Sequence, residues 1–244
     1  MRIIITVLLS FCAVVYAEYP SGTTILNKVD ENLTSETRIV TSKMIIHSRR
    51  GSRTVESRTW ARGDQQTYTE YLSPPREQGT KMLKLDDQLW LYSPNTDRII
   101  QISGHMLRQS VMGSDLSYDD MMEDPRLSDI YDASVTGTEI IDERTCWVVS
   151  LVAKRENVAY HKRKMWVDIE RYAPLMEEQY AKSGQLLKKI NLKDFRRIDN
   201  RWYPFRMTYK DVLKTGDGTE FIIESIEFNV AIPEHYFSKA SLRR

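Results

Sequence analysis

Short apolar segments separated by turn residues recur along almost the whole chain, and this pattern constrains the fold more than any other feature. About thirteen segments of this kind are present, each rich in β-branched and aromatic residues and bounded by Gly, Pro, Asn, Asp or Ser. They are residues 38–47, 53–62, 67–72, 81–85, 89–92, 98–102, 133–141, 146–153, 162–168, 175–180, 186–195, 202–210 and 221–228. We therefore expect a mainly β protein with one large antiparallel sheet.

The alternation within these segments is uneven, and this predicts the shape of the sheet. Leu89–Tyr92 and Trp147–Val149 are apolar at every position, whereas Arg53–Arg58 is polar on one side. In a sheet with one face in water, apolar and polar residues would alternate along every strand. We expect a curved sheet whose concave side is covered by helices in its middle and whose flanks are wet.

Two segments with helical character interrupt the strands. Residues 21–33 place Ile25, Leu26, Val29 and Leu33 on one stripe behind a Ser21 cap. Residues 105–122 contain four of the ten methionines, with a break at Gly113 and a short helix capped by Asp115 or Ser117. Methionine suits a site that accepts different apolar shapes, although gap-filling in an ordinary core explains the same composition. We expect residues 104–124 to form a lid whose carboxylates face solvent.

The first residues predict export. Met1–Ala17 combines one Arg, a short apolar run and small residues at Val15 and Ala17, which is the pattern of a cleaved signal peptide. An uncleaved anchor and lipidation at Cys12 are the alternatives. Residues 18–244 would then form a single domain in the periplasm, with Cys146 as the one remaining cysteine, buried in a strand and unable to form an intrachain disulfide.

Charge and motifs argue against several classes of function. The net charge of +1 provides no cationic field for nucleic acid. The four histidines, His47, His105, His161 and His235, lack zinc-ligand spacing. Ser114 lacks the second glycine of a nucleophile elbow, and no nucleotide-binding motif occurs. We therefore expect no catalytic residues, no metal and no cofactor.

Two clusters of charged residues need a structural explanation. The acidic residues between Asp115 and Asp124 do not follow an EF-hand, so a solvated helix face is expected. The basic residues at 162–164 and 188–197 lie in strands, where neighbours point to opposite faces. A solvated convex face, or docking to an acidic partner or anionic head groups, would account for them.

Several strings of residues resemble the LolA-like outer-membrane lipoprotein-sorting protein family. They are Leu89–Pro94, Arg98, Ile102–Ser103, Met112–Asp120, Trp166–Asp168, Ala173–Leu175, Tyr180, Gly184 and Trp202–Pro204. The resemblance implies a half-open antiparallel β-barrel with a helical lid over an apolar cavity that takes acyl chains. The family's carriers move lipoproteins from an inner-membrane exporter to an outer-membrane acceptor, although members of this broad branch need not carry lipoproteins.

The expected function is that of a monomeric, non-enzymatic carrier of lipid acyl chains or lipoproteins. The alternative is an accessory or interaction subunit of an inner-membrane transporter, without lipoprotein cargo. The residues expected in the cavity or lid are Met44, Trp60, Tyr68, Leu83, Trp90, Tyr92, Met106, Leu107, Met112, Gly113, Leu116, Met121, Trp147, Trp166, Met176 and Tyr180.

Overall fold

A computed structural model describes residues 19–48, 51–123 and 126–243. The predicted signal peptide and Cys12 lie outside these residues. The strands are β1 Thr37–Ser48, β2 Gly51–Arg62, β3 Gln66–Ser73, β4 Lys81–Leu85, β5 Gln88–Ser93, β6 Arg98–Ile102, β7 Tyr131–Ile141, β8 Arg144–Ala153, β9 Lys162–Asp168, β10 Pro174–Tyr180, β11 Leu186–Ile198, β12 Arg201–Asp211 and β13 Thr219–Phe228. The helices are α1 Gly22–Leu33, α2 Tyr118–Met122 and α3 Leu127–Ile130, with short 3-10 turns η1 Gly104–Arg108, η2 Val111–Gly113, η3 Glu234–Phe237 and η4 Lys239–Arg243.

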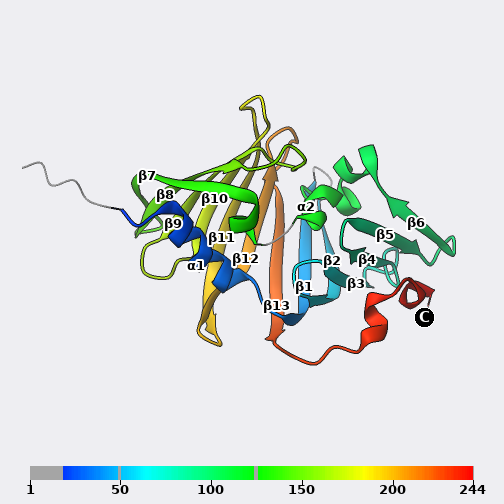
Figure 1. Ribbon diagram of the computed structural model, residues 1–244. Coiled ribbons are helices and arrows are strands. Elements are labelled where there is room, and N and C mark those ends of the chain that lie inside the picture. The colour runs from blue at the N-terminus through cyan, green and yellow to red at the C-terminus, as the bar shows by residue number, and fades with distance from the viewer. Residues whose placement is uncertain (1–18, 49–50, 124–125, 244) are drawn as a thin grey trace, which may run out of the picture.

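The strands form one antiparallel sheet that curves without closing (Figure 1). Its order is β6-β5-β4-β3-β2-β1-β13-β12-β11-β10-β9-β8-β7, so β6 and β7 are the two edges although they follow each other in the chain. The connection between them, residues 103–130, must cross the concave side and carries η1, η2, α2 and α3. The predicted half-open barrel with a helical lid is confirmed.

Helix α1 covers the concave side of the sheet between β7 and β12 (Figure 1). Ser21 caps it by accepting a hydrogen bond from the Thr24 amide at 3.1 Å. Gly22 lies so close to β7 that a Cβ atom would come within 2.3 Å of the Ala133 carbonyl oxygen, so a larger residue would push the helix away. Ile25, Leu26 and Val29 are buried against β8 and β9. The helix predicted at 21–33 is therefore confirmed.

The sequence predicted that helices cover the middle of the sheet and that its flanks are wet, and the structure differs from this expectation. The two-faced segments belong to β5 and β8, each the second strand from an edge, and not to the middle of the sheet. For β5, the reason is a second covering element that sequence patterns did not reveal, whereas the second face of β8 packs with Trp166 and Leu175. Residues 229–243, here called the C-terminal segment, run under the convex face of the β2–β5 half and bury it (Figure 1).

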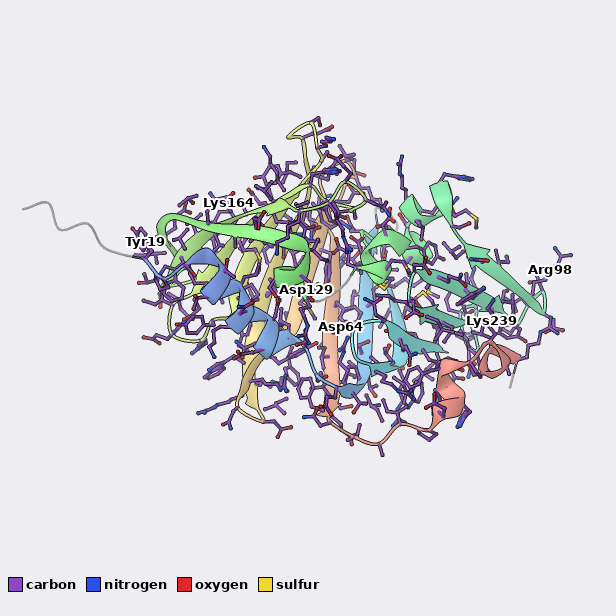
Figure 2. The ribbon with its side chains drawn as sticks, viewed as in Figure 1. Tyr19, Asp64, Arg98, Asp129, Lys164 and Lys239 are labelled. Carbon is purple, nitrogen blue, oxygen red and sulfur yellow. The ribbon has the colours of Figure 1, made fainter. Side chains whose placement is uncertain are left out.

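The convex face of that half carries a ladder of large side chains. Ile39, Trp60, Tyr68, Leu83 and Trp90 stand directly opposite one another across β1 to β5. Tyr236 of the C-terminal segment stacks on Trp60 with ring centroids 4.6 Å apart. Lys239, labelled in Figure 2, places Nζ 4.0 Å from the Trp90 ring centroid. Leu242 is fully buried beneath them.

Replacing Trp90 should lower stability without a specific effect on the concave side. Trp90→Ala removes a buried ring and its cation–π partner, and should lower the free energy of unfolding by roughly 3–5 kcal/mol in denaturant titrations. Ile140→Ala, at a side chain with 74% exposure, is the control and should change it by less than about 0.5 kcal/mol. A Trp90→Ala protein of unchanged stability would contradict this assignment.

Candidate functional site

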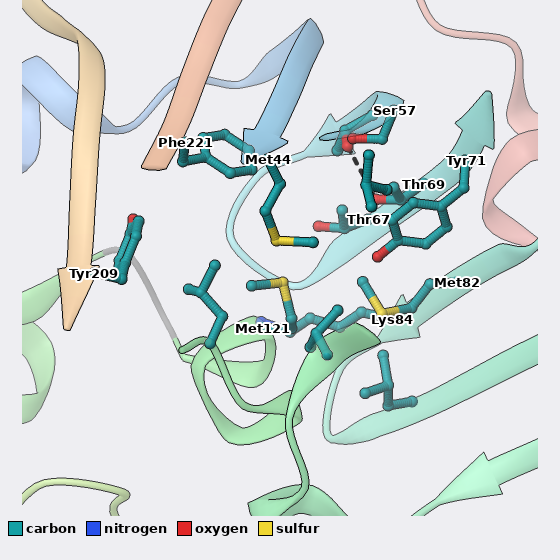
Figure 3. A pocket seen from close by; sticks show the side chains of 15 residues that line it. Met44, Ser57, Thr67, Thr69, Tyr71, Met82, Lys84, Met121, Tyr209 and Phe221 are labelled. Carbon is teal, nitrogen blue, oxygen red and sulfur yellow. Dashed lines mark hydrogen bonds between the residues drawn. The ribbon is translucent and has the colours of Figure 1, made fainter. Parts of the chain in front are cut away.

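The concave side contains an apolar cavity of about 200 Å³ between the sheet and the connection that carries α2. Figure 3 shows Met44 and Met82 from the sheet and Met121 from α2 around this space. The lining side chains are Met44, Val55, Ser57, Thr59, Thr67, Thr69, Tyr71, Met82, Lys84, Leu89, Val111, Leu116, Met121, Tyr209 and Phe221. Methionines from three elements and aromatic rings at either end make this an adaptable apolar site.

Turn geometry positions the part of the lid that closes this cavity. Met112 and Gly113 both have positive φ, 51° and 74°, which turns the chain sharply before α2. Arg53 donates a hydrogen bond to the Met112 carbonyl oxygen and also pairs with Glu77 at 2.9 Å. Ser117 and Asp120 form a capping box at the start of α2, so the predicted Ser117 cap is confirmed. These contacts bring Leu116 and Met121 down onto the cavity.

Buried charges hold α2 to the other half of the sheet. Lys188 of β11 pairs with Asp120, and the Tyr160 hydroxyl donates to Asp120 at 2.7 Å. Arg163 of β9 pairs with Glu123, at the end of α2, and with Glu177 at 2.7 Å. We call these five charged side chains and Tyr160 the buried ion cluster.

The buried ion cluster corrects the expectation that the lid carboxylates face solvent. Asp115, Asp120 and Glu123 point inward, and the Asp115 carboxylate accepts from the Thr219 hydroxyl and the Asp211 amide. The basic runs divide between faces as strand alternation predicts, but Arg163 and Lys188 are 5% and 4% exposed. Their partners lie far away in sequence, so the charge runs alone did not reveal the pairing.

The cluster contains two cations and three carboxylates, so one carboxylate is in excess. Burial raises the pKa of Glu123 to about 7, against the lowering effect of Arg163, with a further increase from Asp120 and Glu177. Arg163 retains Glu177 as a partner when Glu123 is protonated. The lid therefore has a contact whose charge changes near neutral pH.

The other thirteen predicted site residues lie elsewhere or at the margin of the cavity. Only Met44, Leu116 and Met121 of the predicted set line it. Met106, Leu107 and Met112 pack partly buried against the same core, and Gly113 lies in an open depression beside Met112. Trp60, Tyr68, Leu83, Trp90 and Tyr92 belong to the cluster beneath the C-terminal segment. Trp147 lies under α1, Trp166 and Met176 pack around Cys146 on the opposite face, and the Tyr180 hydroxyl bonds to Glu178.

Strand parity explains which cavity residues were missed. Met44 pairs with Val55 across the β1–β2 hairpin, so Thr59 and Ser57 share the face of Met44 whereas Trp60 does not. Met82 and not Leu83 continues this face on β4. Counting residues outward from the Ser48–Gly51 pair gives this parity, whereas the large aromatic residues Trp60 and Trp90 lie on the opposite face.

The remaining chemistry is limited. The Cys146 thiol is buried, which raises its pKa to about 11 and makes it a poor nucleophile, as predicted. Ser114 is fully buried and donates to the Leu116 carbonyl oxygen. Within the described ranges, no three His, Cys, Asp or Glu side chains converge as metal ligands, and no helix is long and apolar enough to cross a bilayer.

An open antiparallel sheet wrapped around a lid and an apolar cavity is the architecture of LolA-like proteins. The chain is similar to an outer-membrane lipoprotein-sorting protein domain from Vibrio parahaemolyticus, with 25% identity, a TM-score of 0.79, and coverage of 91% of this chain and 98% of that one. A LolA superfamily protein from Nitrosomonas europaea matches at 22% identity and a TM-score of 0.73, over 91% of this chain and 100% of that one.

A family model described only as an uncharacterized protein, of the DUF1329-like type, matches residues 63–244, and the chain belongs to this family. A DUF1329 family protein from Desulfovibrio piger has the same fold, with 23% identity, a TM-score of 0.81, and coverage of 91% of this chain and 97% of that one. No curated protein matches the sequence. The predicted family resemblance is thus confirmed.

Neutralising Glu123 should remove a pH dependence of stability. A carboxyl group whose pKa is raised by folding contributes stability that is present below its ordinary pKa of 4.5 and is lost as the pH rises through about 7. Glu123→Gln keeps a hydrogen-bond acceptor for Arg163 without the charge. The melting temperature of this variant, relative to the unmodified protein, should therefore rise between pH 5 and pH 8.

Glu227→Gln, at an exposed carboxylate on β13, is the matched control and should show no such trend. An equal loss of stability for Glu123→Gln at both pH values would mean that Glu123 is ionised throughout the range.

Proposed function

We propose that this protein is an exported carrier that buries an acyl chain in the concave cavity and carries it through the periplasm. The cavity carries this proposal, because it is apolar, rich in methionine and closed by a separate connection instead of by the sheet. Similarity to a lipoprotein-sorting domain from Vibrio parahaemolyticus supports the same class of cargo, lipid or lipoprotein. We also propose that residues 1–17 are a signal peptide and that residues 18–244 form the carrier domain, which acts as a monomer without catalysis.

Volume limits what the cavity can hold in the observed arrangement of the lid. A methylene group occupies a volume similar to that of a water molecule, about 30 Å³ in the liquid, so 200 Å³ accommodates roughly seven carbon atoms. At about 0.8 kcal/mol for each buried methylene, this gives about 6 kcal/mol before the costs of binding. A transfer free energy of this size supports only weak binding. A long chain therefore requires the connection at residues 103–130 to move outward and lengthen the cavity.

An inner-membrane exporter and an outer-membrane acceptor are the proposed partners for loading and release. Each would need to displace the same lid, because the lid covers the cavity. In the competing interpretation, an accessory subunit of a transporter, the space under α2 is an unoccupied gap in an ordinary core.

A charged residue at the cavity should abolish ligand binding while the fold remains. Met44→Asp places a carboxylate in the apolar lining and should weaken binding of N-phenylnaphthylamine, a neutral fluorophore, to delipidated protein by at least about tenfold. Ile140→Asp, at the exposed edge strand, is the control and should bind normally. Absence of saturable binding to the unmodified protein would favour the accessory-subunit interpretation.

Hydrogen exchange should report lid motion. Amides of residues 104–122 are held by short turns and side-chain contacts, so they should exchange faster than those of 146–153 in β8, which is paired on both sides. Dodecanoate should slow exchange in the lid selectively, because an occupant adds contacts to Leu116 and Met121. Equal protection of residues 104–122 with and without dodecanoate at saturation would argue for a rigid cover.

A further inference from the structure

One buried polar side chain in the cavity lining has no partner. Tyr71 of β3 is 5% exposed and lines the cavity, and Figure 3 shows its hydroxyl group directed toward Met82. No residue in the described part of the chain forms a hydrogen bond with this hydroxyl group. Burial raises the pKa of Tyr71, and Tyr118 and Glu77 raise it further, so the phenol keeps its proton. A buried donor without an acceptor is costly, and a ligand in the cavity can supply the acceptor.

Two threonines beside Tyr71 add a further donor. Thr59 and Thr69 stand opposite one another on β2 and β3, and their hydroxyl oxygens are 3.0 Å apart. The two hydroxyl groups share one hydrogen bond, so one of their two protons remains for another acceptor. Thr69 and Tyr71 are two residues apart on one strand, which places them on the same face about 6.6 Å apart. The lining at this place therefore offers protons from neutral hydroxyl groups.

The same lining offers a ligand no free positive charge. Among the described residues that line the cavity, Lys84 is the only one with a charged side chain. Its ammonium group donates to three carbonyl oxygens, at 3.1, 3.1 and 3.4 Å, which belong to Asp64, Met122 and Glu123. An ammonium group has three protons, and these acceptors use them. An ionised carboxylate in the cavity would therefore be buried without a cation, at a high cost in free energy.

We propose that the polar end of the cargo is a neutral ester, and that the Tyr71 hydroxyl group recognises it by donating a hydrogen bond to the ester carbonyl oxygen. An ester has oxygen acceptors but neither a proton nor a charge, which matches a lining with neutral donors and no free cation. The hydrocarbon chain extends from Tyr71 between Met44 and Met121 toward Phe221 (Figure 3). This assignment rests on the proposed carrier function and specifies the chemical class of its ligand.

Two ligands of equal length that differ only in the carbonyl group test this recognition. Methyl dodecanoate and dodecyl methyl ether are each used to displace N-phenylnaphthylamine from the delipidated protein at pH 8. The ester is expected to bind about fivefold or more tightly, because the ether lacks the carbonyl acceptor. Tyr71→Phe should remove this preference, while the affinities for the ether and for the fluorophore stay within about twofold. Dodecanoate, which is ionised at this pH, should bind more weakly than the ester.

Tyr68→Phe is the matched control. Tyr68 lies on the same strand and is 3% exposed, but it packs in the cluster beneath the C-terminal segment, so its variant should keep the full ester preference. Equal affinity for ester and ether in the unmodified protein, an unchanged preference in Tyr71→Phe, or tighter binding of dodecanoate than of the ester would overturn the ester assignment and leave the carrier function standing. Failure of the fluorophore to bind, or of all three ligands to displace it, would overturn both.

Discussion

The position of β6 and β7 at opposite edges of one sheet is the constraint on which the rest of this structure depends. Two meanders, β1–β6 and β7–β13, are joined by pairing of β1 with β13, and this leaves consecutive strands on the two far sides. The chain between them must cross the concave opening. A lid is thus a consequence of connectivity, and the space beneath it becomes a cavity because the sheet is curved and does not close.

Two helices cover the two halves of the concave side, and different interactions hold each of them. Under α1, apolar residues such as Ile25, Val29 and Met165 pack together in one buried cluster. Under α2, the cover rests on buried ion pairs at one side and on methionines at the other. Breaking a buried pair costs several kcal/mol, so the buried ion cluster holds α2 in place. On the side of β1–β5, hydrogen bonds from Arg53 to the Met112 carbonyl oxygen and from Lys84 to the Met122 carbonyl oxygen add to the methionine contacts.

The buried ion cluster has one carboxylate more than it has cations, and Glu123 is the carboxylate whose pKa is raised. Protonation of Glu123 relieves repulsion from Asp120 and Glu177 without removing Arg163 from its second partner. The charge of the Glu123–Arg163 contact therefore changes as the pH passes through about 7.

The sequence by itself determined the strands, α1, a short helix capped by Asp115 or Ser117, and the burial of Cys146, because each depends on local periodicity or on a few neighbouring residues. It also carried the family resemblance, in strings such as Met112–Asp120. Only the tertiary structure decided which face of each strand lines the cavity. Trp60 and Trp90 face the C-terminal segment, and Ser57, Thr69 and Lys84 face the lid, because side chains alternate and one residue of register exchanges the two faces. The pairing of Arg163 and Lys188 with α2 was hidden for a related reason, since contacts between residues forty or more positions apart leave no periodic trace in the chain.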